Sequence, residues 1–93
     1  KAYKYQSLAA GFAGRKADPF MVTVHPTPDE TPIYLNSHPG QEYNIVLKGR
    51  MLLQINNKEL ILEEGDSIYF NSELPHGMKA LDGEKVSFLA IIL

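Results

Sequence analysis

The sequence predicts an all-β domain, an antiparallel β-sandwich or β-barrel, and three observations carry this prediction. Helical periodicity is hard to find, because 6 prolines interrupt most windows of about ten residues in the first and last thirds of the chain. Short runs rich in Val, Ile, Tyr and Phe recur roughly every eight to twelve residues. Gly, Pro, Asn and Asp separate these runs, as is typical of turns between strands.

Taken in order along the chain, the runs divide it into strands joined by short connections. Only Ser7–Ala13 is a helix candidate, and it is short. The stretch His25–Pro32, with its prolines and acidic residues, is typical of an irregular surface loop. We predict a single domain over residues 1–93 with strands at Tyr3–Leu8, Phe20–His25, Ile33–Ser37, Glu42–Leu47, Met51–Ile55, Lys58–Glu63, Ser67–Phe70, His76–Ala80 and Val86–Ile92.

Two of the connections have well-defined turn residues. Asn56-Asn57 separates two strand-like runs, and Asn tolerates the positive φ that a tight hairpin requires. Asp82-Gly83 has the same character and precedes the last run of the chain. We therefore expect a hairpin at each of these two positions.

Length and composition exclude several classes of protein. The 93 residues are enough for one core. The net charge is -2 and the sequence has no basic run longer than Arg15-Lys16, so we expect no direct contact with nucleic acid. The longest apolar run falls far short of the ~20 residues of a membrane span, so we expect a soluble, cytoplasmic protein without membrane contact. Because the chain begins at Lys1 without an initiator Met, we expect it to be the C-terminal part of a longer protein.

The absence of cysteine limits any metal site to His, Asp, Glu and Asn ligands. Pro39-Gly40 provides a bend that brings His38 and Glu42 toward a common point, and His76 follows Pro75 on another strand. Two imidazoles and one carboxylate inside a small barrel suit a divalent metal such as Fe, Mn, Ni or Zn.

Residues two apart on a strand share a face. The neighbours of the three candidate ligands on that face can therefore form a pocket around them. The residues that share a face with His38, Glu42 or His76 are candidates for the pocket wall: Tyr34, Asn36, Asn44, Val46 and Met78.

These residues resemble the two sequence motifs of the cupins. Asn36-Ser-His38-Pro-Gly-Gln-Glu42, followed by six residues and Gly49, is similar to the first motif, His-x-His, three or four residues, Glu, six residues, Gly. The stretch from Gly65 to Pro75-His76-Gly77 is similar to the second. The resemblance implies a cupin-type antiparallel β-barrel, or jelly roll, with His38, Glu42 and His76 as inward-facing metal ligands.

The sequence departs from the cupin pattern at one ligand position. Asn36 stands where the first motif has a His, so three of four ligand positions remain. We expect weak or partial metal occupancy, and tighter binding after Asn36→His, because imidazole is a better ligand than an amide for these ions. Alternatives stay open, in which His38 is a solvated loop residue, Glu42 a solvent-facing carboxylate and His76 a pocket residue that binds an organic ligand. Other departures fall at Glu30, Asn71, Glu73 and Ala80.

Two functions of different class fit this resemblance. Tyr5-Gln-Ser-Leu8, Asp18–Val24 and His38–Glu42 resemble the C-terminal cupin domain of Xre-type helix-turn-helix transcription regulators. That implies a domain that binds a small-molecule effector and contacts DNA only through an N-terminal domain that precedes Lys1. The alternative is a stand-alone metal-dependent cupin enzyme of the isomerase or dioxygenase type. The sequence offers no obvious general base, so it favours the sensor over the enzyme.

The strand pattern also predicts an assembly. Tyr43, Ile45 and Leu47 fall on the face opposite Glu42, and the terminal strand is apolar on both faces. Apolar residues on the outer side of a small domain need a cover, so we expect a homodimer.

Overall fold

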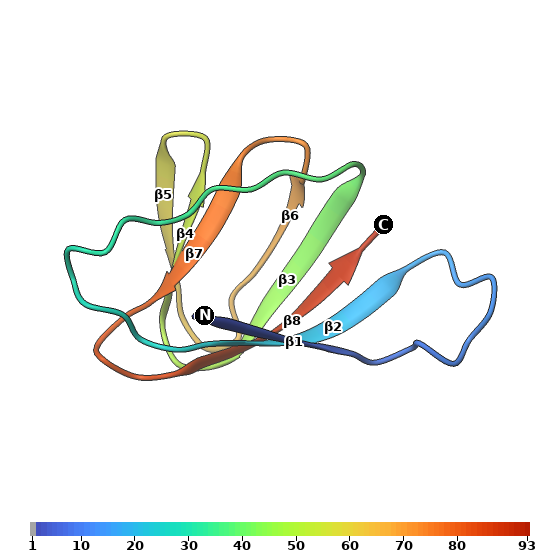
Figure 1. The fold of residues 1–93 in the computed structure, drawn as a ribbon, viewed down its shortest axis with the longest axis horizontal. Coiled ribbons are helices and arrows are strands. Elements are labelled where there is room, and N and C mark those ends of the chain that lie inside the picture. Colours follow the sequence, from blue (N-terminus) through green and yellow to red (C-terminus); the bar gives the residue numbers. More distant parts are fainter. Residues whose placement is uncertain (1) are drawn as a thin grey trace.

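The computed structural model describes residues 2–93, and within them it has eight strands and no helix. The strands form two antiparallel sheets that face each other as a jelly roll, which confirms the predicted fold class (Figure 1). The larger sheet has the order β1-β2-β8-β3-β6 and the smaller the order β5-β4-β7. The strands are β1 Tyr3–Ser7, β2 Asp18–Val24, β3 Gln41–Lys48, β4 Met51–Ile55, β5 Lys58–Leu62, β6 Ser67–Asn71, β7 His76–Ala80 and β8 Val86–Ile92.

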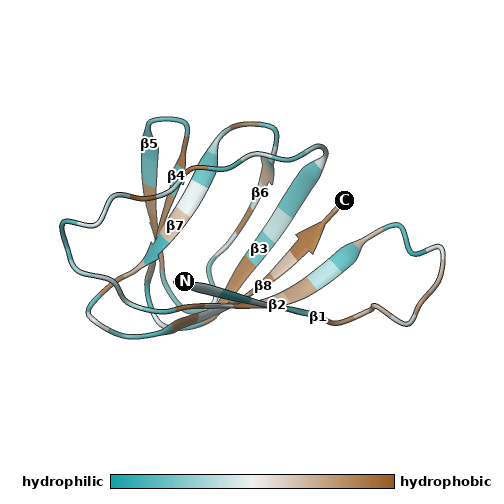
Figure 2. Cartoon of the chain, in the orientation of Figure 1, coloured by the Kyte–Doolittle hydropathy of each residue, from teal (hydrophilic) through white to brown (hydrophobic). Residues whose placement is uncertain are grey.

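The core lies between the two sheets and follows the period of two along each strand. On β8, for example, Val86, Phe88 and Ala90 are buried, and the residues between them are half-buried on the outer face. Figure 2 shows β8 as mainly hydrophobic, whereas β3 changes from hydrophilic at its start to hydrophobic toward its end. The polar start of β3 is where the candidate site lies.

The turn residues behave as predicted, but one of the two hairpins does not form. Asn56 has a φ of 54° between the paired strands β4 and β5, so that hairpin is confirmed. Asp82 and Gly83 have φ values of 61° and 67°, yet the strands on either side of them belong to different sheets. The predicted second hairpin is wrong, because β8 pairs with β2 and β3 and buries its apolar residues in the middle of the larger sheet.

Two predicted elements are absent. The helix at Ser7–Ala13 is wrong, because Ser7 ends β1 and the residues after it form bends and turns, with Gly11 and no apolar stripe to pack on the core. The strand at Ile33–Ser37 is also wrong, since the segment forms only an isolated bridge between Asn36 and His76. The other predicted strands agree with the observed ones to within two residues at each end.

Among residues 2–93 no helix is long and apolar enough to cross a membrane.

Candidate metal centre

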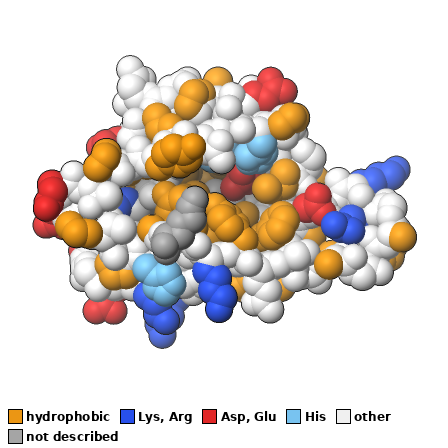
Figure 3. All heavy atoms as spheres, in the orientation of Figure 1, with side chains coloured by type: hydrophobic (Ala, Val, Ile, Leu, Met, Phe, Trp, Pro, Cys, Tyr) orange, Lys and Arg blue, Asp and Glu red, His pale blue; other side chains and the backbone are white. Residues whose placement is uncertain are grey.

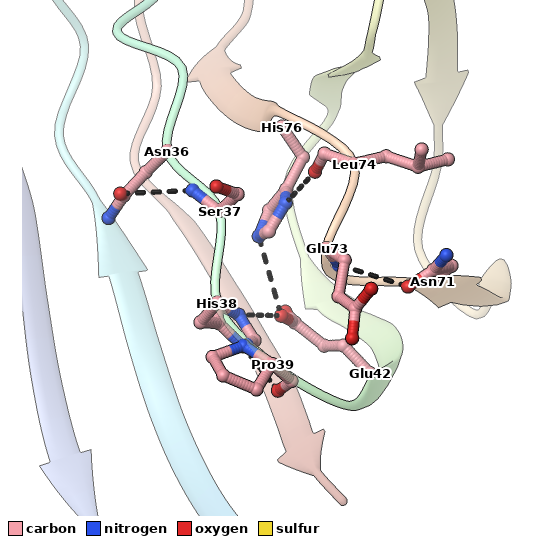
Figure 4. A network of polar contacts seen from close by, with 9 residues as sticks. All are labelled: Asn36, Ser37, His38, Pro39, Glu42, Asn71, Glu73, Leu74 and His76. Carbon is pink, nitrogen blue, oxygen red and sulfur yellow. Dashed lines mark hydrogen bonds and ion pairs between the residues drawn. The ribbon is translucent and has the colours of Figure 1, made fainter.

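Three side chains from three places in the fold meet between the sheets. Glu42 is the second residue of β3 and points inward, and His76 is the first residue of β7 in the opposite sheet. His38 belongs to the segment that leads into β3. Figure 4 shows the two imidazoles turned toward the Glu42 carboxylate. We call His38, Glu42 and His76 the triad.

The triad has the dimensions of a metal site. One ligand atom from each residue lies within 4.8 Å of the others. Glu42 Oε1 is 3.0 Å from His38 Nε2 and 3.6 Å from His76 Nε2. Two nitrogens and one carboxylate oxygen form a 2-His-1-carboxylate set, which suits Fe(II) and leaves positions for other ligands.

The hydrogen bond on the far side of His76 determines which of its nitrogens can bind a metal. His76 Nδ1 lies 2.8 Å from the Leu74 carbonyl oxygen, which can only accept, so Nδ1 carries the hydrogen. In the neutral ring, Nε2 then presents a lone pair toward Glu42 Oε1. A cation between these two facing lone pairs would bind to both of them. A hydrogen bond on the far side of the ring, such as the one to Leu74, is also what orients histidines that bind metals. The donor set therefore fits a metal.

Glu42 is buried, with 5% of its surface exposed, and its second oxygen has its own partner. The fully buried Asn44 lies two residues further along β3 on the same face. With its amide nitrogen turned toward the carboxylate, Asn44 donates to Glu42 Oε2 over 2.8 Å. This bond fixes the carboxylate so that Oε1 faces the histidines, and it partly compensates for the burial of the charge.

The segment that carries His38 is attached to the edge of β7. Asn36 exchanges both backbone hydrogen bonds with His76, at 2.9 and 2.8 Å, and His38 N–H donates to the Ser72 carbonyl. Gly77 permits this approach, because a Cβ there would lie 2.4 Å from the Tyr34 carbonyl oxygen. The Asn36 side chain accepts from Ser37 N–H and points away from the triad (Figure 4).

A cavity of about 620 Å³ extends from the triad between the sheets. Figure 3 shows hydrophobic side chains gathered around this hollow, with histidine and acidic side chains beside it. Of the predicted pocket residues, Tyr34, Asn36 and Met78 line the cavity, whereas Asn44 and Val46 are buried on the inner face of β3 beside it. Binding of a ligand by these residues stays a prediction.

The sequence reasoning missed the wall that β1 and β2 provide. Tyr3, Tyr5 and Phe20 line the cavity, and the Tyr3 hydroxyl donates to the Met78 carbonyl over 2.7 Å, which links the two sheets. Burial raises the pKa of the Tyr3 phenol. Burial also raises the pKa of Tyr5, helped by the nearby charges of Tyr3 and Glu42. The i, i+2 spacing of the two tyrosines on a predicted strand was the available signal.

The fold and the motif residues agree with a known family. The family model described as "Cupin domain" matches residues 20–92, and the chain belongs to the cupin family. None of the curated proteins compared matches the chain.

Among solved structures, the chain is similar in fold to the cupin domain of an XRE-family transcriptional regulator from Enterobacter cloacae. The identity is 19% and the TM-score 0.83, over 99% of this chain and 96% of that one.

The chain is also similar to hydroxypropylphosphonic acid epoxidase from S. wedmorenis, with 27% identity and a TM-score of 0.84 over 99% of its length. It spans 51% of that enzyme's chain. An Fe(II) form of the epoxidase in complex with substrate matches at 26% identity and a TM-score of 0.83, over 98% of this chain and 54% of that one. A Co(II) form matches with 26% identity and a TM-score of 0.84, over 98% and 53%.

Proposed function

We propose that this chain is a metal-binding cupin domain that recognises a small molecule and acts as the sensor domain of a helix-turn-helix transcription regulator. The observation that carries the proposal is the position of the triad at one side of a cavity that is otherwise lined mainly by apolar side chains. This arrangement combines a strong polar anchor with an apolar surface, as ligand-binding cavities do.

A divalent metal such as Fe, Mn, Ni or Zn would supply a Lewis-acidic anchor for an oxygen ligand. The residues of the chain provide the rest. His76 presents Nε2 because its Nδ1 is bonded to Leu74, and Asn44 holds Glu42 in place. The burial of Glu42 keeps water from competing for the carboxylate.

The regulator role rests on two resemblances. The first is that of Tyr5–Leu8, Asp18–Val24 and His38–Glu42 to Xre-type cupin domains, and the second is the common fold with the Enterobacter cloacae domain. In this proposal the protein is cytoplasmic, and DNA is bound by an N-terminal domain rather than by the residues described here. The coding sequence upstream of Lys1 tests it. A helix-turn-helix there supports the sensor, and a start codon immediately before Lys1 contradicts it.

A metal-dependent enzyme is the second candidate. The specific observation in its favour is the 26% to 27% identity with the epoxidase over nearly the whole chain, together with that enzyme's Fe(II) form. Turnover of a bound ligand by the Fe(II)-loaded protein, lost in His76→Ala, would favour the enzyme over the sensor.

We also propose a homodimer through the outer face of the larger sheet. Across β2, β8 and β3, Met21, Leu89 and Ile45 lie opposite one another and are only half-buried, and Tyr69 on β6 is 55% exposed. A continuous apolar row of this kind is typical of an interface. Sedimentation at micromolar concentration should show a dimer that Leu89→Lys dissociates, and a 10.4 kDa monomer alone would contradict the proposal.

Metal analysis tests the anchor itself. Protein purified without affinity-column metal is titrated with Co(II), and binding is followed by the visible absorption of the ion. We expect the natural sequence to bind Co(II) with the same affinity as His25→Ala, which changes an exposed histidine that lines the cavity outside the triad. His76→Ala should abolish the binding. Equal binding by both variants would show that the triad is not the site.

A further inference from the structure

Along the strands of the larger sheet, the side chains of the cavity wall change from the charged Glu42 to apolar residues. The register places Glu42 opposite Ile92, then Ala90 opposite Phe20, then Phe88 opposite Val22. All of these except Glu42 are apolar, and each lines the cavity. Phe20 and Ile92 are half-buried and offer the cavity side-chain surface near the triad, whereas Val22, Val24 and Phe88 are 0–1% exposed and form its closely packed apolar floor.

Apart from the triad, the basic side chains among the described lining residues are Lys79 and the exposed His25, next to Val24 at the end of β2. Among the described residues that line it, Lys79 is the only lysine, and arginine is absent. The Lys79 ammonium donates to the carbonyl oxygens of Asp29 and Thr31, at 2.7 Å each. Two of its three hydrogens are therefore used to hold the segment before β3 against β7.

From this distribution we infer that the ligand is an amphipathic monoanion, a carboxylate with an apolar body. The inference rests on the proposed function, because the carboxylate head binds the metal held by the triad. The apolar body lies along the β2 and β8 side chains, where burial of methylene groups provides the affinity.

A second anionic group on the ligand is disfavoured by the same geometry. At the apolar floor it would lie against Phe20, Val22 and Phe88, where nothing replaces its hydration. Lys79 offers it only the single hydrogen that the carbonyl oxygens of Asp29 and Thr31 do not accept. A dicarboxylate should therefore bind more weakly than a monocarboxylate of equal length.

The test is a series of probes titrated into the Co(II)-loaded chain. Butanoate, hexanoate and octanoate differ only in the length of the apolar body, and adipate has the length of hexanoate with a second carboxylate. Calorimetry should show affinity rising about fourfold for each methylene that becomes buried. Adipate should bind at least about tenfold more weakly than hexanoate, since an unpaired charge on an apolar surface is costly. Each carboxylate should also change the visible spectrum of Co(II), which reports the head group at the metal.

A matched pair of variants tests the wall. Phe20→Ser removes an apolar side chain from the cavity, and Ile61→Ser removes an exposed one on β5 that does not line it. Phe20→Ser should weaken octanoate about tenfold and leave butanoate nearly unchanged. Ile61→Ser should change neither.

The outcomes separate the inference from the function on which it rests. A chain that takes up no Co(II) overturns the proposed metal site, and the inference with it. A chain that takes up Co(II) but binds butanoate and octanoate equally, or prefers adipate to hexanoate, overturns the inference alone. If Phe20→Ser does not fold, the probe series on the natural sequence still decides between these outcomes.

Discussion

The three candidate metal ligands belong to two kinds of backbone, regular strands and an irregular segment. Glu42 and His76 belong to β3 and β7, whose ladders of hydrogen bonds hold them on opposite sheets. His38 belongs to the irregular segment between β2 and β3, which is attached to the barrel by few backbone bonds, chiefly those of Asn36 to His76 and of His38 to Ser72. The pairing of the strands thus fixes the positions of Glu42 and His76. The position of His38 depends on the docking of one segment.

This difference explains how the site is assembled. His76 takes part in both regions, because its backbone pairs with Ile55 on β4 and with Asn36 on the docked segment. The docking of the segment therefore depends on the position of β7 in its sheet. We expect metal affinity to be most sensitive to the strand-borne ligands, less to the group that orients them, and less again to the docking contacts.

The largest effect should follow the loss of a strand-borne ligand. Glu42→Gln keeps the shape of the side chain but removes the charge that a divalent ion needs. We expect Co(II) affinity to fall by more than about 100-fold, because changes of outer partners alone cost 10–100-fold. Calorimetric titration measures it. Affinity within a factor of about three of the natural sequence would remove Glu42 from the site.

The next effect should come from Asn44, whose amide donates to the Glu42 carboxylate and to the Tyr43 carbonyl oxygen. Asn44→Ala removes the donor to Glu42 Oε2 and leaves that oxygen buried without this partner. We expect Co(II) affinity to fall about 10–100-fold while His38 and His76 still bind. A comparison with Asn57→Ala, on the exposed turn before β5, controls for the loss of an amide. Equal affinities in the two variants would mean that Asn44 does not orient Glu42.

A smaller effect should follow a change in the docking of the segment. Gly77→Ala places a methyl group 2.4 Å from the Tyr34 carbonyl oxygen, so the segment must move. We expect the free energy of unfolding to fall by about 1–3 kcal/mol, and metal affinity to fall by less than about tenfold. Gly11→Ala is the control, because a Cβ there meets nothing within 4 Å. Denaturant unfolding and Co(II) titration should leave that control unchanged.

The smallest effect is expected at Asn36, and here sequence and structure disagree. The motif comparison predicts that Asn36→His tightens metal binding. The side chain at this position points away from the triad, so the structure predicts a change of less than about twofold. Co(II) titration of the variant decides. A strong increase would mean that the side chain at position 36 turns inward when a metal is bound.

Much of the fold could be read from local pattern. The alternation of buried with half-buried residues along β3 and β8, and the turn at Asn56, depend on neighbours a few residues away. The false strand at Ile33–Ser37 shows where that reading fails. Its residues alternate as a strand does, but Pro32 and Pro39 bound it and only Asn36 pairs with another strand.

The sequence alone determined the strand periodicity, the cupin motifs and the identity of the three residues of the triad, because these depend on residue type and spacing. Only the tertiary structure decided that β8 lies between β2 and β3, that Asn44 holds Glu42, that Asn36 turns away, and that the cavity floor becomes apolar beyond the triad. These features come from pairing between distant segments and from the docking of an aperiodic segment. Their energies depend on contacts across the barrel, which no local pattern records.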